Sequence, residues 1–302
     1  MLPLRLFRDP VFDVASASLF LATCSLFAAT VFMPLFLQNV TGASATNSGL
    51  LLLPVMLGIL VTSIGSGRII SRTGRYKLFP VLGFALMTVG LIALSTPPQA
   101  EVKASFLNAR TTQITASLYM LVFGLGFGMV SQVLVLAIQN AVDRRELGTA
   151  TAAANFFRGL GGAVGVAVYG TTFANRLGYW LPRSVPRYLL GHLSPTVLQA
   201  SPGTIHTLRP AVRDGVAQAV AHSVGTVFLI ATPIAALGFL VVLFLKEYPL
   251  RTWGQDGAGL QSRAARSGAE QASPAATTPS SGVQRPQEAG IPGSTRRSIQ
   301  QA

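Results

Sequence analysis

One basic side chain stands within a segment of small and apolar residues, and its chemistry suits binding or gating inside a membrane. Arg158 lies about three turns into a segment that begins near Thr149. A guanidinium inside a bilayer is costly and must face water, a partner or a cavity. Two interpretations follow. Arg158 is either a cavity or gate charge, or an anchor whose head group snorkels to the cytoplasmic interface.

Other polar side chains interrupt the apolar segments. Gln132 and Gln139 are seven residues apart, which is two helical turns, so they share one face of a helix. They line a cavity in one interpretation and form interhelical hydrogen bonds in the other. The remaining polar residues of this kind are Thr23, Ser25, Thr30, Ser131 and Asn155.

No catalytic or metal-binding pattern accompanies these residues. The sequence contains no HExxH, Walker loop or dinucleotide fingerprint, so we expect neither an enzyme nor a cofactor or metal. Cys24 is the only cysteine, so it cannot build a disulfide framework or a zinc site. The apolar segments also contain no acidic residue, although a proton-coupled transporter usually keeps an ionisable group in the membrane.

The spacing of charged residues predicts the helices that hold these side chains. Residues 14–67 carry no charge, in a chain with 23 Lys/Arg and 10 Asp/Glu, and a span needs roughly 20 apolar residues. Such long continuous runs favour helices over barrel strands. We therefore expect an all-α polytopic membrane protein with six transmembrane helices. The predicted spans are residues 14–37, 48–70, 78–95, 113–140, 149–176 and 223–245.

The composition agrees with a membrane protein and divides the chain in two. The chain is 50% hydrophobic and 11% charged, against about 25% charged in soluble domains. Its net charge of +13 does not indicate nucleic-acid binding, because no basic helix is interleaved with aromatic residues. We expect a six-span unit over 1–253 and a disordered cytoplasmic tail over 254–302, which has no aromatic residue. Residues 177–221 are expected to form a proline-rich surface connection that includes or borders all three histidines.

The basic residues also predict the orientation. Lys and Arg in short loops stay on the cytoplasmic side, and the turn over 39–47 has none. Both termini are therefore expected in the cytoplasm, which fits an even number of spans. The basic residues of the predicted inner segments are Arg5, Arg8, Arg68, Arg72, Arg75, Lys77, Arg144, Arg145, Lys246 and Arg251.

The segment between the second and third predicted spans resembles the signature loop of the major facilitator superfamily. Gly67, Arg72, Gly74 and Arg75 match its pattern, and Ser71 replaces the acidic residue, which weakens the charge-relay role attributed to this loop. Gly74 is expected to form a tight turn. Four other stretches resemble the fourteen-span multidrug:proton antiporter branch. They are LRLFRDPVF, MPLFLQNVTGASATNSGLLLLP, FFRGLGGAVGVAVYGTTFANRL and KEYPLR.

This resemblance implies half of a transporter. The fold would be a six-helix bundle of two inverted three-helix repeats, paired with an N-terminal half or a second copy across a midplane cavity. The implied function is proton-driven export of lipophilic or cationic small molecules by alternating access at the cell membrane. Its partners would be lipid, protons and a small-molecule substrate. The rival hypothesis is a truncated or half-size membrane protein with an interaction or regulatory role.

In the family, the first, second, fourth and fifth spans of each half border the cavity. This implies a set of cavity residues, and the glycine spacing predicts sites where helix backbones pack closely. The cavity candidates are Thr30, Gln132, Gln139, Asn155 and Arg158, and the packing glycines are Gly124, Gly128, Gly161 and Gly165.

Cysteine labelling tests the predicted topology. In a Cys24→Ala background, cysteine at Thr41 or Ser194 should react with an impermeant maleimide from outside. Cysteine at Thr73 should react only from inside, because the basic loop is expected in the cytoplasm. Labelling of position 73 from outside would overturn the orientation.

Overall fold

Six long α-helices dominate the structure, a computed structural model that describes residues 9–41, 44–50, 52–95, 109–142, 144–185 and 210–246. All of them lie within one unit, Met1–Arg251, and the predicted tail lies outside the described residues. The long helices are α1 (Pro10–Phe36), α3 (Leu53–Thr73), α4 (Leu78–Ser95), α6 (Ala109–Ala141), α7 (Leu147–Ser184) and α9 (Pro210–Leu243). The short elements are a π-helix (Leu37–Thr41), α2 (Ala45–Leu50) and a 3₁₀ turn (Arg144–Glu146). The all-α fold is confirmed.

Prolines open several of these helices, because a first-turn N–H has no partner within the helix. Pro10 begins α1, where the Asp9 side chain accepts a hydrogen bond from the Val11 N–H at 2.9 Å. Pro54 lies in the first turn of α3, so the predicted span 48–70 is divided between α2 and α3. Pro210 begins α9.

The predicted surface connection over 177–221 is wrong at both ends. Helix α7 continues to Ser184, since Pro182 falls in its last turn, and α9 already begins at Pro210. The two extensions pack together: Gly215 lies against the Ser184 carbonyl, and Val216 is buried. His222 is therefore a helical residue, and only residues 186–209 of the predicted connection remain outside the described part.

Among the residues that the structure describes, five helices are long and apolar enough to cross a membrane. Their spanning segments are Pro10–Val40, Thr46–Thr73, Leu78–Ser95, Ile114–Ala141 and Arg213–Leu243. Helix α7 has 38 residues, a length of about 57 Å, but it is less apolar because it carries Arg158 and many glycines. Its crossing of the membrane stays a prediction.

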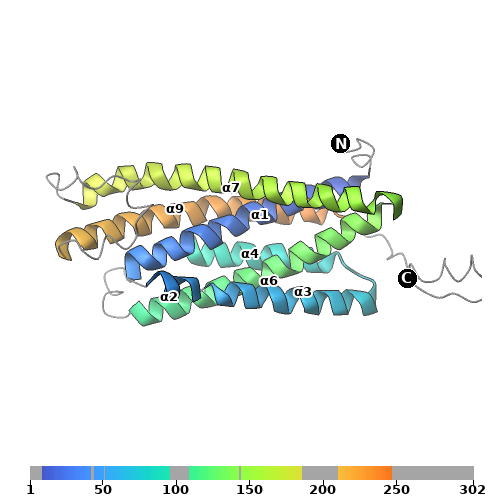
Figure 1. The fold of residues 1–302 in the computed structure, drawn as a ribbon, viewed down its shortest axis with the longest axis horizontal. Coiled ribbons are helices and arrows are strands. Elements are labelled where there is room, and N and C mark those ends of the chain that lie inside the picture. The colour runs from blue at the N-terminus through green and yellow to red at the C-terminus, as the bar shows by residue number, and fades with distance from the viewer. Residues whose placement is uncertain are drawn as a thin grey trace, which may run out of the picture. The chain divides into compact units, whose positions relative to one another are not determined.

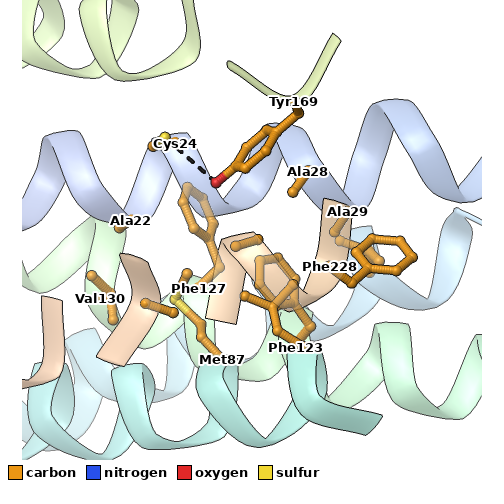
Figure 2. Packing of buried hydrophobic residues seen from close by; sticks show 14 of the residues in the cluster. Ala22, Cys24, Ala28, Ala29, Met87, Phe123, Phe127, Val130, Tyr169 and Phe228 are labelled. Atoms are coloured by element: carbon orange, nitrogen blue, oxygen red, sulfur yellow. Dashed lines mark hydrogen bonds between the residues drawn. The ribbon is translucent and has the colours of Figure 1, made fainter. Parts of the chain in front are cut away.

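Helices α1 and α6 join the bundle together. Helix α1 contacts α6, α7 and α9, and α6 also contacts α3 and α4. Figure 1 shows α7, α9 and α1 along one side and α3 along the other, with α6 running obliquely toward the start of α7. The core between them is aromatic and aliphatic, with Met87, Phe123 and Phe228 fully or almost fully buried (Figure 2).

Glycines allow the closest helix contacts. A Cβ atom at Gly124 or Gly128 would collide with the α3 backbone, and one at Gly161 would collide with the Phe20 carbonyl of α1. A Cβ atom at Gly165 would come within 3.0 Å of the Cys24 carbonyl oxygen. All four glycines expected to pack helices thus lie at helix–helix contacts. Near Gly165, the Cys24 Sγ and Tyr169 Oη atoms share a hydrogen bond at 3.6 Å (Figure 2).

The turn after α3 depends on one glycine. Gly74 caps the helix at φ +70°, and its N–H donates to the Ile70 carbonyl at 2.8 Å. Two residues later, the buried Tyr76 hydroxyl donates to the Lys246 carbonyl at 3.1 Å. The basic loop is thereby fixed to the segment that follows α9.

Replacing Gly74 by valine should destabilise the chain by about 1–2 kcal/mol, because a side chain in the left-handed region collides with its own backbone. Thermal unfolding in detergent, followed by circular dichroism, measures the loss. Gly74→Asn should recover most of it, since asparagine tolerates this conformation. Gly67→Val is the matched control, because a Cβ atom there meets nothing within 4 Å. Equal losses at positions 67 and 74 would contradict the assignment.

A second pair of variants tests the contact between α1 and α7. Gly161→Val should destabilise the bundle by about 1–3 kcal/mol through overpacking. Gly159→Val should leave the unfolding temperature of this chain unchanged, because Gly159 faces open space. A tolerated valine at position 161 would show that α1 does not approach α7 there.

Candidate functional site: a polar seam between α6 and α7

Polar side chains meet where the end of α6 faces the start of α7. The Arg158 Nη2 atom donates to Ser131 Oγ at 2.7 Å, and the Gln139 Nε2 atom donates to Thr151 Oγ1 at 3.2 Å. We call this region the α6–α7 seam. It consists of Ser131, Gln132 and Gln139 on α6 and Thr151, Asn155 and Arg158 on α7.

Arg158 is only partly satisfied in this seam. Its side chain is half-buried, and its Nε atom is buried without a hydrogen-bond partner among the described residues. Leaving such a donor unsatisfied costs about 1–3 kcal/mol. The guanidinium also forms no ion pair with a carboxylate among the described residues. The seam therefore holds a positive charge that the described residues do not neutralise.

The packing of α1 against α7 gives the depth of Arg158. Gly161 faces Phe20 and Gly165 faces Cys24, so the two helices run in the same direction. By this register Arg158 lies level with Ala17, one turn deeper than Asp13. The uncharged stretch of α7, residues 159–175, spans about 25 Å. Arg158 thus lies at one end of the uncharged stretch of α7, and its side chain donates across to α6.

The cavity candidates fall into two groups. Gln139 and Arg158 form the seam hydrogen bonds, while Gln132 and Asn155 belong to the seam with exposed side chains. Thr30 does not take part, because its hydroxyl donates to the Leu26 carbonyl of its own helix at 3.0 Å.

Sequence reasoning did not select two members of the seam. The sequence pattern identifies Ser131 as one of several polar residues in the apolar segments but not as a cavity candidate. Thr151 is absent from both groups. A usable signal existed for Thr151, because Thr151, Asn155 and Arg158 have the i, i+4, i+7 spacing of one helix face.

Helix α7 exposes two chemically different surfaces. One, the small face, has side chains that are small or polar, and the other carries Phe156, Leu160 and Val164. A Cβ atom added at Gly148 or Gly159 would meet nothing within 4 Å. The small face consists of the exposed residues Gly148, Ala152, Asn155, Gly159 and Ala163. It has no partner helix among the described residues.

The signature residues lie around the end of α3. Gly67 is on the exposed side of the helix and Arg72 in its last turn, while Gly74 and Arg75 form the turn. A cation in the last turn stabilises the negative end of the helix dipole. Gly67 and Arg72 thus belong to the last two turns of α3, while Gly74 and Arg75 lie beyond its end.

At the opposite end of α7, aromatic residues gather near the predicted outer interface. The Trp180 ring stacks on His222 of α9 with centroids 4.6 Å apart, and the Arg183 guanidinium lies 3.6 Å from the centre of the Tyr179 ring. Trp and Tyr favour membrane interfaces. This cluster therefore fits an interfacial anchor better than a binding site.

Comparison with known proteins gives the family. The Major Facilitator Superfamily model matches residues 2–166. An uncharacterized MFS-type transporter of Mycobacterium tuberculosis is 38% identical over 83% of this chain and 34% of its own length. The Bacillus subtilis multidrug transporter protein MdtP is 31% identical over 63% of this chain and 33% of its own. A Streptomyces rimosus tetracycline resistance determinant is 32% identical over 59% of this chain and 49% of its own.

A solved structure supports the fold. The E. coli fucose:proton symporter FucP aligns with a TM-score of 0.55 and 18% identity, over 84% of this chain and 55% of its own. The chain spans about a third of the length of the first two curated relatives above. Family, fold and helix composition agree, and the chain belongs to the major facilitator superfamily, as a multi-pass membrane protein of a transporter family and not an enzyme.

Proposed function

We propose that this chain acts as the C-terminal half of a fourteen-span multidrug:proton antiporter. The assembled transporter exports lipophilic or cationic small molecules across the cell membrane by alternating access, with both ends of this half in the cytoplasm. The sequence stretches that resemble this branch, and their order along the chain, support the proposal. So do the printed names of two relatives, a multidrug transporter and a tetracycline resistance determinant.

The observation that carries the proposal is the unpartnered small face of α7. Lipid contact does not require Gly148, Ala152 and Gly159 to be small, whereas close approach of another helix does. Helix α3 shows the contrast, because it exposes Leu53, Met56 and Leu60, which suit lipid. The small face is thus best suited to contact the other half of a transporter.

The seam beside the small face supplies polar groups for a cavity. Its tether between Arg158 and Ser131 is a single hydrogen bond, so small shifts between α6 and α7 can break and remake it. Within the described spanning helices, acidic residues occur only near the helix starts, Asp13 in α1 and Asp214 in α9. The carboxylate that couples transport to protons therefore belongs to the other half in this proposal.

Vesicle efflux tests the function. This chain, reconstituted with a supplied N-terminal half and a pH gradient, should export ethidium, while the chain alone should not. Efflux by neither preparation, with both correctly folded, would favour the interaction or regulatory role. The Gly159→Val variant adds a further test. The variant chain should fold normally by itself, but the assembled transporter should lose efflux, because the small face would no longer fit the other half.

Variants of Arg158 test the seam. Arg158→Lys should insert normally but lose most efflux, because a point charge replaces a forked donor. Arg158→Leu should insert at least as well, by about 2.5–3.5 kcal/mol on the insertion scale if no snorkelling relieves the charge, and also transport poorly. Normal efflux by both variants in the assembled transporter would make Arg158 an interfacial anchor.

A further inference from the structure

We propose that the α6–α7 seam is a carboxylate-binding site with Arg158 as its fixed positive charge. The inference rests on the proposed function, because it names the chemical group that this half receives next to its cavity. The carboxylate belongs either to a lipophilic substrate or to an Asp or Glu side chain of a helix that packs on the small face.

Charge is the first argument. The nearest acidic residue of α7's own segment is Glu146, twelve residues away, which is about 18 Å along the helix. On α1, Asp13 lies one turn nearer the cytoplasmic end and forms no ion pair with Arg158. The facing residues of α6 are the neutral Ser131, Gln132 and Gln139. A half-buried guanidinium in such surroundings gains most from a single negative charge brought by another molecule or segment.

The donor groups point to a carboxylate. Ser131 holds one edge of the guanidinium through Nη2, and the adjacent Nε–H has no acceptor among the described residues. The Nε and Nη2 donors of a guanidinium form a planar fork that matches two carboxylate oxygens. Because the Arg158 Nε atom is buried, the guanidinium must turn toward the ligand for both donors to bind it. The other amide-bearing residues of the seam, Asn155 and Gln132, are exposed. One cation with neutral amides suits a monoanion better than a dianionic phosphate.

The surroundings define the rest of the ligand. Next to Arg158 along α7, Gly159 and Ala163 are exposed, and a Cβ atom at Gly159 would meet nothing within 4 Å. This surface accepts an apolar body, whether an alkyl or aromatic chain or the side of a helix. A cationic group is repelled at this position. At the seam itself, the charge thus favours lipophilic carboxylates over lipophilic cations, and a cationic substrate such as ethidium would bind elsewhere in the cavity of the proposed transporter.

Binding to the whole 302-residue chain in phosphatidylcholine nanodiscs tests the proposal. The first probe is radiolabelled decanoate, compared with decanol and decyltrimethylammonium, each corrected for uptake by empty nanodiscs. Arg158→Gln should weaken decanoate binding about 10- to 100-fold, the value of a charge-assisted hydrogen bond. Arg158→Lys should retain part of it. Arg176→Gln, at an exposed arginine near the other end of the same helix, is the matched control and should bind like the wild type.

The second probe separates the two sources of the carboxylate. It is a fluorescent Leu/Ala transmembrane peptide that carries one Glu at the depth of Arg158, compared with the same peptide carrying Gln. Arg158-dependent association with the Glu peptide but not with decanoate assigns the site to a carboxylate of a neighbouring helix. Arg158-dependent binding of decanoate assigns it to a lipophilic ligand. Circular dichroism of each variant ensures that lost binding is not lost folding.

Failure of this inference is distinct from failure of the proposed function. Binding is measured without a pH gradient or a second half, so a chain that supports no efflux can still bind carboxylate through Arg158. If neither probe binds in an Arg158-dependent way, or if decyltrimethylammonium binds as well as decanoate, the carboxylate site is overturned even when efflux is normal.

Discussion

Close backbone contact between helices is the constraint on which this bundle depends. Lipid chains are as apolar as leucine side chains, so no hydrophobic force drives helices together within a bilayer, and association relies on packing and hydrogen bonds. Gly58 of α3 and Gly124 and Gly128 of α6 bring those two helices into backbone contact, and Gly83 with Gly126 does so for α4 and α6. Helix α6 is thereby held between two neighbours, and its C-terminal end is directed toward α7.

The same constraint gives the glycines of α7 different meanings. Gly161 and Gly165 already pack against α1. Their contacts define the register of α7 along α1, and so the level of every other α7 residue relative to α1. Gly159 and Gly148 lie on another side, where the described chain offers them nothing to contact. Glycine spacing alone does not separate these cases. Only the register between α1 and α7 shows which glycines are used within this bundle and which are free for another helix.

Much of the fold could be predicted because charge is so costly in hydrocarbon. The uncharged runs located the six long helices, and the left-handed conformation at Gly74 followed from the turn it had to make. The prediction failed where proline was taken as a breaker. Pro210 opens α9, where a missing N–H and a fixed φ are tolerated, and α7 continues through Pro182 for two further residues. The pairing of Arg158 with Ser131 could not be predicted, because the sequence of two helices does not contain their relative rotation.

The hydrogen-bond partner of each polar side chain shows why the seam differs from other polar positions. Most hydroxyls in the apolar helices donate to the carbonyl four residues earlier, as Thr23 does to Leu19 and Thr62 to Gly58. Such a residue needs no cavity, so a threonine in an apolar run is weak support for a binding site. Two longer polar side chains of the seam behave differently. Arg158 and Gln139 reach across to another helix, and only the arginine brings a charge that its hydrogen bond does not neutralise. The cost of that charge, rather than polarity in general, is what singles out the α6–α7 seam as the candidate functional site.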